Sequence, residues 1–143
     1  GQATWFGWNN FQDIDAEVNT GTDPDPVVQN YQTVWAFAVG AEYKYSDKLT
    51  LRGGMQYDET PTTDQYRTTR TPDGDRTWLS TGATYSLNDK IDLDFAATYI
   101  WISEEEISVT RNTPFSGLGG TTQVNADTDG SVGIVAAGFT YKF

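Results

Sequence analysis

The chain has 143 residues, a formal net charge of -11 at pH 7 and neither cysteine nor histidine, and its length fits a single domain. The negative charge argues against nucleic acid as a partner, and the two missing residue types exclude disulfides, thiol sites, Ser-His and Cys-His triads and the usual histidine zinc sites. No stretch approaches the ~20 consecutive apolar residues of a transmembrane helix, so a helical membrane protein is excluded as well.

The composition leaves two classes of all-β protein open. Hydrophobic residues make up only 37% of the chain and the mean hydropathy is -0.54, as in a soluble protein, but 14% of the residues are aromatic. Strands of a transmembrane barrel alternate lipid-facing and lumen-facing residues, so their mean hydropathy stays low. A soluble all-β domain and an outer-membrane barrel are therefore the two candidates.

The first aromatic segment runs from Ala3 to about Val18 and is predicted to be a strand, followed by a loop over residues 19–29. Its alternation is imperfect, because the aromatic residues near its start fall on both faces. These residues are Trp5, Phe6 and Trp8.

The clearest alternation lies between residues 31 and 45. One face is apolar with aromatic ends (Trp35, Phe37, Val39, Ala41, Tyr43 and Tyr45), and the other is small or charged (Ala36, Ala38, Gly40, Glu42 and Lys44). This period of two is that of a β-strand. The same pattern predicts strands over residues 49–57, 78–87, 91–101 and 134–143, so that the chain holds about six strands and no helix.

The predicted connections alternate between short and long. Tight turns are expected at residues 46–48 and 88–90, and long loops at about 59–76 and 104–130. Outer-membrane barrels have short periplasmic turns and long extracellular loops, whereas a soluble sandwich has no reason to keep this order. The order favours an all-β, antiparallel up-and-down transmembrane barrel. The competing fold is a soluble jelly roll or lectin-like sandwich, whose purified chain would stay monomeric in water without detergent.

Aromatic residues mark both ends of the apolar faces. The segment from Trp35 to Tyr43 covers roughly 26 Å at ~3.3 Å per residue, which spans about 20 Å when a strand tilts by ~40°. That span is close to the ~25 Å apolar band of barrels. The chain ends on Phe139, Tyr141 and Phe143, which share one face and resemble the terminal signal by which outer-membrane barrels are recognised for assembly.

One run of residues is more specific than the alternation. It consists of Tyr57-Asp58-Glu59-Thr60-Pro61, then Tyr66-Arg67-Thr68-Thr69-Arg70, then Thr71-Pro72-Asp73-Gly74-Asp75-Arg76-Thr77-Trp78-Leu79-Ser80. This run closely resembles the C-terminal third of the outer-membrane long-chain fatty-acid transporter family (FadL/TodX-type), as do residues 3–11 and 138–143. The resemblance implies a barrel of about fourteen strands around an N-terminal plug. Residues 1–143 are then expected to be its C-terminal part, without the plug and the first strands.

The resemblance also implies a function, which is passive uptake of long-chain fatty acids or other hydrophobic compounds across the outer membrane of a Gram-negative bacterium by a multi-pass barrel. Capture near the extracellular loops, binding in an apolar interior and release by plug rearrangement or a wall opening would involve no enzyme activity, no cofactor and no metal. The expected partners are a hydrophobic small molecule, outer-membrane lipid and lipopolysaccharide, the N-terminal remainder of the chain and the barrel assembly machinery, but no nucleic acid. A general diffusion porin or another outer-membrane barrel is the alternative, and a soluble all-β binding module is a further one.

Five residues are candidates for the substrate path. Arg52, Asp58 and Trp78 lie at lumen-facing positions of predicted strands, and Arg67 and Arg70 of the long loop could meet a fatty-acid carboxylate. The competing interpretation, which we prefer, is a solvated lumen wall with loop ion pairs that contribute little individually.

A second group of candidates comes directly before the strand that contains Trp78. It consists of Pro72, Asp73, Asp75 and Arg76. These residues are interpreted chiefly as a structural corner between loop and strand, in which Pro72 sets the turn and Arg76 pairs with a carboxylate. The competing interpretation is that they orient the outer end of the strand near the place where substrate enters.

Overall fold

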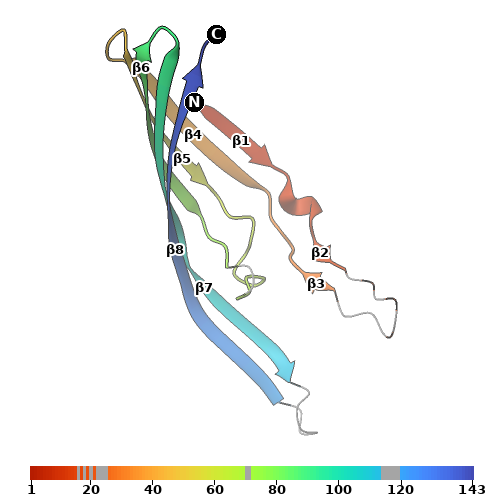
Figure 1. Ribbon diagram of the computed structural model, residues 1–143. Helices are drawn as coiled ribbons and strands as arrows, with labels where there is room; N and C mark the ends of the chain where they lie inside the picture. Colours follow the sequence, from red (N-terminus) through yellow and green to blue (C-terminus); the bar gives the residue numbers. More distant parts are fainter. Residues whose placement is uncertain (16, 18, 20, 22–25, 70–71, 114–119) are drawn as a thin grey trace.

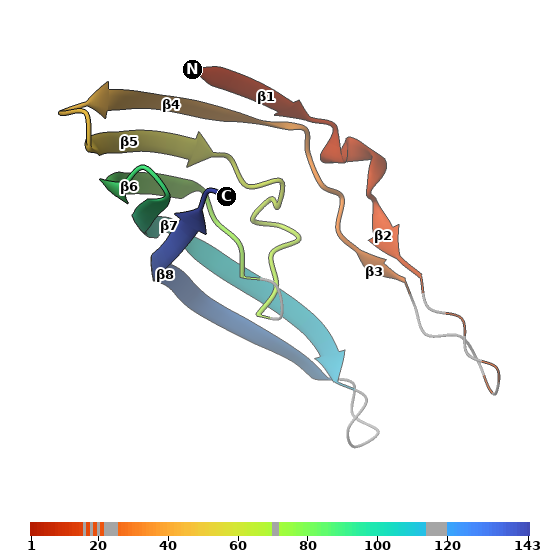
Figure 2. The same ribbon diagram turned by 45° about the horizontal axis from the view of Figure 1, so that its top comes forward.

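The described part of the chain forms one curved, six-stranded antiparallel sheet and a separate two-stranded ribbon (Figures 1 and 2). The computed structural model describes residues 1–143 except 16, 18, 20, 22–25, 70–71 and 114–119, and the side chains of 111–113. The large sheet has the order β1 (Gln2–Phe6), β4 (Val34–Lys44), β5 (Leu49–Asp58), β6 (Arg76–Asn88), β7 (Ile91–Thr113) and β8 (Gly120–Tyr141). The ribbon pairs β2 (Asp13–Ile14) with β3 (Val27–Val28).

Within the large sheet, neighbouring strands are antiparallel and follow one another in the chain, with β4 next after β1. This is an up-and-down order. This order confirms the predicted all-β, antiparallel, up-and-down class. Among the described residues, the one helical element is a single 3-10 turn, η1 (Trp8–Asn10). None of the helical segments in the described residues is long and apolar enough to cross a membrane.

The register gives the sheet two chemically different faces. The aromatic face carries residues that are all exposed: Trp35, Phe37, Val39, Tyr43, Leu51, Met55, Tyr57, Leu79, Tyr85, Phe95, Tyr99, Trp101, Val135, Phe139 and Tyr141. The opposite, polar face carries Gly40, Glu42, Lys44, Arg52, Gln56, Asp58, Arg76, Trp78, Ser80, Thr84, Asp94 and Thr98. The predicted period of two is thereby confirmed for the strand segments 35–44, 51–58, 76–85, 94–101 and 135–141.

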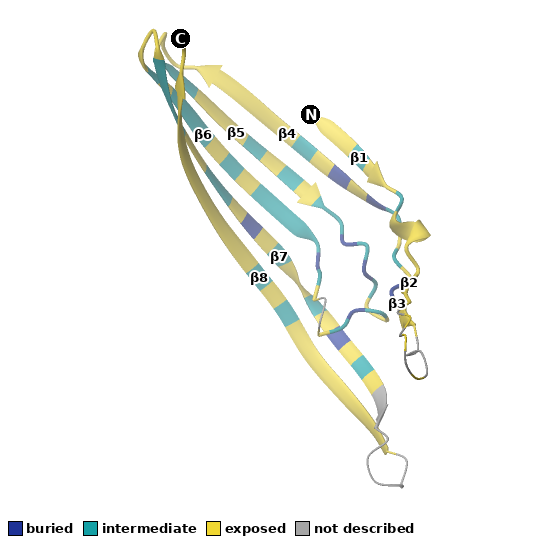
Figure 3. Cartoon of the chain, turned by 45° about the vertical axis from the view of Figure 1, so that its right-hand side comes forward, coloured by how far each residue is buried: buried dark blue, intermediate teal, exposed yellow. Residues whose placement is uncertain are grey.

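No second sheet covers the aromatic face in the described part of the chain. Phe37, Leu51, Phe95 and Phe139 are 49%, 39%, 55% and 75% exposed, so they do not meet in a two-layer interior. The few buried apolar residues lie instead on the polar face and its extension, at Val34, Ala36, Ile100 and Ile107 (Figure 3). Since water-soluble monomers rarely expose apolar patches of more than a few hundred Å², this face needs an apolar environment.

The two ends of the sheet differ in their connections. The two short turns and the C-terminus lie at one end, and the long connections lie at the other (Figure 1). Side chains close both short turns: the Ser46 hydroxyl accepts from the Leu49 amide at 3.1 Å, and the Asn88 amide oxygen accepts from the Ile91 amide at 3.0 Å. Such local bonds are the reason that Ser and Asn favour tight turns.

The first predicted strand is wrong in its extent, because the chain leaves the large sheet after Phe6. Gly7 precedes the 3-10 turn, in which the Phe11 amide donates to the Trp8 carbonyl at 2.8 Å and the Asn10 side chain donates to the Gly7 carbonyl at 3.4 Å. Gly and Asn are turn residues, and here they interrupt the strand. The next strand, the short β2, belongs to the separate ribbon with β3. Residues 16 and 18 lie outside the described residues.

The long loop predicted at 104–130 is also wrong. β7 continues to Thr113, and β8 begins at Gly120, so the two strands form a long hairpin beyond the sheet. Its pairs include Ile107 with Ala126 and Val109 with Val124. Threonine and valine favour strands and alternate here with polar residues, which outweighs the loop-like content of Gly, Asn and Asp. A bulge between Ile102 and Glu105 joins the hairpin to the sheet.

Candidate functional site

The polar face is covered at the long-loop end by the segment between β5 and β6, of which residues 59–69 and 72–75 are described. This segment lies on the inner side of the curved sheet (Figure 2). Backbone bonds hold it to the start of β4: the Glu59 amide donates to the Trp35 carbonyl at 3.2 Å, and the Gln32 amide donates to the Pro61 carbonyl at 3.0 Å. The segment thereby closes one end of the polar face.

Arg67 connects this segment to β7. The residue is 2% exposed, and its guanidinium donates to the Asp73 carbonyl at 2.8 Å and to Asp64 at 2.5 Å. It also forms an ion pair with Glu105 at 3.2 Å. A buried guanidinium is stable only when its donors are paired, so Arg67 fixes the position of all three groups. Arg67 thus forms ion pairs, but it is buried and joins the loop to β7, unlike the solvated loop ion pairs expected from the sequence. Arg70, the other predicted loop arginine, lies outside the described residues.

The predicted corner residues Asp73, Asp75 and Arg76 are brought together by Thr60. The Thr60 hydroxyl donates to Asp73 at 2.8 Å, and the Thr60 amide donates to Asp75 at 2.8 Å. Arg76 pairs with Asp73, and the Tyr57 hydroxyl donates to Asp75. Pro72 is exposed at the edge of this cluster. The geometry is that of an ordered loop-to-strand corner, and its role in transport stays a prediction.

Gly74 lets the corner approach β7 closely. A Cβ atom added at Gly74 would lie 2.8 Å from the Ser103 carbonyl oxygen and 2.9 Å from the side chain of Glu105. The Ser103 amide also donates to the Asp75 carbonyl at 2.8 Å. The corner therefore packs directly on the bulge of β7, and only glycine fits at this contact.

Beside the corner lies a cavity of about 350 Å³, which we call the loop-end pocket. It is lined by Phe6, Trp8, Tyr31, Val34, Trp35, Ala36, Gln56, Asp58, Glu59, Pro61, Asp73 and Arg76. The aromatic side comes from the end of β1, from η1 and from the residues before β4. Trp8 stacks on Phe6 and meets Tyr31 edge to face, with 6.5 Å between ring centroids in both pairs. The charged groups of the lining are Asp58, Glu59, Asp73 and Arg76.

The charged side of the loop-end pocket has more carboxylates than cations. Asp58 accepts from the Gln56 side chain at 2.7 Å, and Glu59 accepts from the Trp35 amide at 2.9 Å. Asp73 pairs with Arg76. The lining residues thus combine three carboxylates with one guanidinium beside an aromatic wall. This arrangement can bind and orient an amphiphilic molecule.

Arg52 belongs to a different cluster on the polar face, close to the short turns. Its guanidinium donates to Glu42 and to Thr84 at 2.7 Å each, and Thr84 donates to Asp94 at 2.6 Å. We call these four residues the polar ladder, because they follow one another across β4, β5, β6 and β7. Arg52 therefore lies on the predicted face, but it is not adjacent to Asp58 or Arg67 in the bonding network.

Trp78 lies on the polar face between Gln56 and Ile100, as predicted from its parity. Its indole N–H is buried without a hydrogen-bond acceptor among the described residues. It borders a depression of about 430 Å³ whose lining includes Gly40, Gly54 and Ser80. Small residues leave this part of the inner wall open beside Trp78, which keeps it a candidate for the substrate path.

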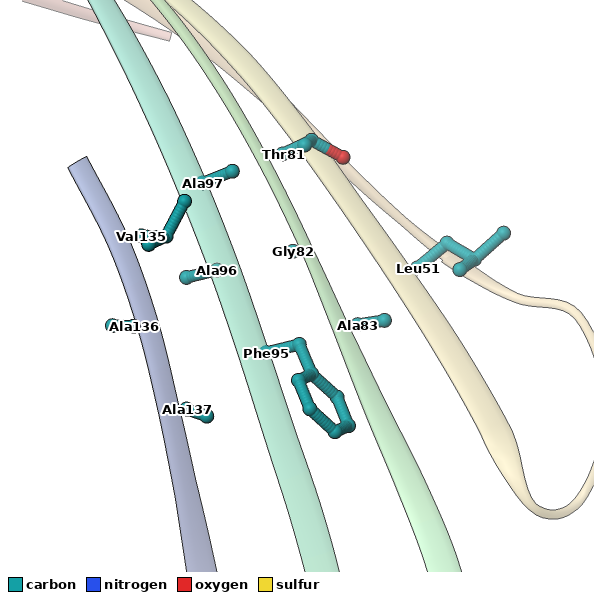
Figure 4. Close-up of a pocket in the computed structure, with 10 residues that line it drawn as sticks. All are labelled: Leu51, Thr81, Gly82, Ala83, Phe95, Ala96, Ala97, Val135, Ala136 and Ala137. Atoms are coloured by element: carbon teal, nitrogen blue, oxygen red, sulfur yellow. The ribbon is translucent and has the colours of Figure 1, made fainter. Parts of the chain in front are cut away.

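A further hollow of about 480 Å³ lies over the middle of β5 to β8. Figure 4 shows Ala83 between Phe95 and Leu51, and Ala97 and Ala137 belong to the same lining. These residues belong to the aromatic face, so the hollow is on the side opposite to the loop-end pocket.

Several residues of the site were not predicted from the sequence. Thr60 lies in the run that resembles the family and Glu105 lies in a run of three glutamates, but no contact with the corner or with Arg67 was predicted for either, nor for Asp64. The sequence indicates Trp8 only weakly, because the aromatic residues of the first segment fall on both faces of the predicted strand. It does not indicate the contact with Tyr31.

An up-and-down sheet with one aromatic and one polar face is typical of the wall of an outer-membrane barrel. A comparison with family models identifies the family. The family model described as outer membrane protein transport protein (OMPP1/FadL/TodX) matches residues 1–143. The chain therefore belongs to this family of outer-membrane transport proteins, which confirms the resemblance noted in the sequence. It is a family of transport proteins rather than of enzymes.

Individual relatives agree with the family. The chain is 26% identical over 139 residues to the long-chain fatty acid transport protein of Escherichia coli O6:H1, which covers 97% of this chain and 29% of that protein. It is 32% identical over 96 residues to the protein of the same name from Salmonella typhi, and 33% identical over 93 residues to outer membrane protein P1 of Haemophilus influenzae. These two matches cover 67% and 65% of this chain, and 22% and 20% of the relatives.

A solved structure gives the same result. The crystal structure of a Pseudomonas aeruginosa FadL homologue matches with a TM-score of 0.80 and 31% sequence identity, over 97% of this chain and 31% of that one. The chain thus spans less than a third of the relatives that it matches.

Proposed function

We propose that this chain forms part of the wall of an outer-membrane barrel that takes up long-chain fatty acids or other hydrophobic compounds passively. One observation supports this most directly: the exposed aromatic face lies opposite a polar face that carries the aromatic loop-end pocket. The aromatic face can contact lipid, and the loop-end pocket on the polar face can bind a hydrophobic solute.

The dimensions of the sheet fit a multi-pass position in the outer membrane of a Gram-negative bacterium. β4 has 11 residues, or roughly 36 Å of strand at ~3.3 Å per residue, which spans about 28 Å at a tilt of ~40°. Clustered rings lie near both ends of the aromatic face, with 4.6 Å between the centroids of Tyr99 and Trp101 and 5.2 Å between those of Tyr141 and Phe143. Such rings suit the two membrane–water interfaces.

The chemistry of uptake follows from the long-loop end. A hydrophobic molecule gains free energy when its apolar surface leaves water, and the rings of Phe6, Trp8 and Tyr31 supply that surface. The pocket volume lies within the range of ~300–1,000 Å³ that is usual for small-molecule sites. From this pocket, the open wall beside Trp78 offers the next place along the inner face.

The test is solute uptake by liposomes that contain the full natural chain. We expect entry of a fluorescent fatty acid to exceed that of protein-free liposomes, and Trp8→Ala to reduce it several-fold, because it removes a pocket wall. The matched control is Trp5→Ala, since Trp5 lies on the aromatic face of the same strand region. Uptake equal to that of protein-free liposomes would contradict the proposal.

The polar ladder supports one second candidate, a general diffusion porin, because charged side chains line part of the inner face. The same liposomes distinguish the two functions. A porin would admit small sugars at least as fast as the fatty acid, and it would not respond to Trp8→Ala.

A further inference from the structure

We infer that the indole N–H of Trp78 holds the polar end of the solute on the inner wall, so that the protein selects apolar chains that end in an oxygen acceptor over plain hydrocarbons. This inference rests on the proposed function, because it names an atom that recognises the substrate along the same path. It follows from a buried donor, a hollow beside it and the position of that hollow next to the loop-end pocket.

The donor is the first part of the argument. The indole N–H of Trp78 is buried, and it has no acceptor among the described residues. Most buried polar groups in proteins have a hydrogen-bond partner, because an unpaired donor has lost its bond to water without replacement. A partner for this N–H is therefore expected from outside the described residues. A solute in the hollow that Trp78 borders can supply it.

The hollow is the second part. It has a volume of about 430 Å³, and we call it the inner hollow. Gly40, Gly54 and Ser80 lie opposite one another on β4, β5 and β6, so three neighbouring strands carry no large side chain here. A Cβ atom at Gly54 would lie only 3.2 Å from the Val39 carbonyl oxygen, which disfavours any other residue at this position. The strand packing thereby keeps the inner hollow open.

The polar groups around the inner hollow favour Trp78 as the donor to a solute. None of the side chains that line it, all of them among the described residues, carries a charge. The Gln56 amide already donates to Asp58 at 2.7 Å, and the Ser80 hydroxyl shares a hydrogen bond with Thr98 at 3.0 Å. The Trp78 N–H is the buried donor whose bond is still to be made.

The position of the inner hollow is the third part. Gln56 lines both this hollow and the loop-end pocket, so the two cavities adjoin along β5, and Trp78 lies directly across from Gln56. A solute whose hydrocarbon chain packs on the rings of Phe6 and Trp8 can thus place its polar end at Trp78. An ionised oxygen is a stronger acceptor than a neutral one, whereas a hydrocarbon leaves the N–H unpaired.

The experiment uses the full natural chain in lipid nanodiscs, with isotope-labelled nitrogen in its tryptophan indoles, and follows the indole N–H signals by NMR. The two probes have equal chain length: dodecanoate and dodecane. The signal that is missing from Trp78→Phe belongs to Trp78. We expect dodecanoate to shift this signal and dodecane to leave it in place, because only dodecanoate carries an acceptor.

The same variant tests affinity, because Trp78→Phe keeps an aromatic ring and removes the N–H. It should weaken dodecanoate about five- to ten-fold and dodecane by less than about two-fold. Dodecane binding thereby shows that the variant is folded. The matched control is Trp101→Phe, the same change at an exposed position of the aromatic face, which should leave both affinities within about two-fold.

A second variant leaves Trp78 in place. Ala38→Leu narrows the inner hollow, which Ala38 helps to line, and it should weaken dodecanoate by at least about five-fold. Unchanged dodecanoate binding in this variant would overturn the inference, because the polar end would then lie elsewhere.

Three further results separate the inference from the proposed function. A Trp78 signal that dodecanoate does not move, or equal losses for both probes in Trp78→Phe, would overturn the inference, because the N–H would then serve the packing of the protein itself. Dodecanoate uptake by liposomes that falls with Trp8→Ala but not with Trp78→Phe would overturn the inference alone. No uptake of dodecanoate by the natural chain would contradict both proposals.

Discussion

The two ends of the polar face hold charged residues in different ways. Near the short turns, the polar ladder joins neighbouring strands, and its ion pair between Arg52 and Glu42 is half exposed, at 49% and 60% of the side chains. At the long-loop end, Arg67 is 2% exposed and joins segments that are up to 39 residues apart. The ladder needs only the regular register of a sheet, whereas the long-loop end needs a specific tertiary structure.

This difference predicts where substitutions will matter. Exposed ion pairs contribute little because water already solvates both partners, but a buried cation holds several groups that lose their partner when it is removed. We therefore expect stability to depend on the long-loop end far more than on the ladder. The following changes test that expectation, in order of decreasing effect.

Arg67→Ala should have the largest effect, a loss of about 3–5 kcal/mol in the free energy of unfolding. It leaves Asp64 and Glu105 without their cation, and it leaves the carbonyls of Asp73 and the buried Thr62 without a donor. The measurement is a urea titration of the chain folded in bilayer vesicles, together with the rate of proteolysis of the segment between β5 and β6. The variant Arg52→Gln, for which the smallest loss of stability is expected, provides the comparison.

Phe95→Arg comes next, because it places a charge in the middle of the aromatic face. The expected cost is about 2–4 kcal/mol in a bilayer, as for a cation on the lipid-facing side of a barrel. Ala96→Arg is the matched control, since Ala96 lies next to it on the polar face. If both variants unfold at the same urea concentration, the two faces are not in different solvents.

Gly74→Ala should destabilise the corner by about 1–3 kcal/mol, because its Cβ atom would overlap the Ser103 carbonyl oxygen. Gly138→Ala is the control, since a Cβ atom at Gly138 meets nothing within 4 Å. Urea titrations of the two variants give the comparison. Equal midpoints would mean that the corner does not pack on β7 as described.

Arg52→Gln should have the smallest effect, at most about 1 kcal/mol, because its ion pair with Glu42 is exposed. The expected loss in the same urea titration is several times smaller than that of Arg67→Ala. A loss as large as that of Arg67→Ala would remove the distinction between the two ends of the polar face.

The regular part of the fold was predictable from the sequence because it depends on local alternation. Positions such as Phe37 and Glu42 point to opposite sides of a strand by geometry alone, so both faces could be assigned without knowing the strand pairing. The turn at Asn88 was predictable for the same reason, since its side chain bonds to its own backbone two and three residues later.

The long-loop end was not predictable, because it depends on contacts between distant segments. Arg67 meets Glu105 only because a bulge places Ser103 and Glu104 together opposite Asp129, which turns the next residues of β7 to the other side. No pattern in the sequence marks that bulge. Trp8 and Tyr31 likewise meet across the two segments that flank the ribbon of β2 and β3, outside the regular pairing of the large sheet.

The central claim is that the aromatic face contacts lipid and the polar face contacts water. The absence of cysteine allows a direct test, because single cysteines can be introduced at Val39, Phe95 and Val135 on one face and at Ala38, Ala96 and Ala136 on the other. A spin label at each position in bilayers reports its accessibility to oxygen, which partitions into lipid, and to a water-soluble nickel complex. We expect oxygen to dominate at the first three positions and nickel at the other three. Equal accessibility on both faces, or the reverse order, would contradict the account.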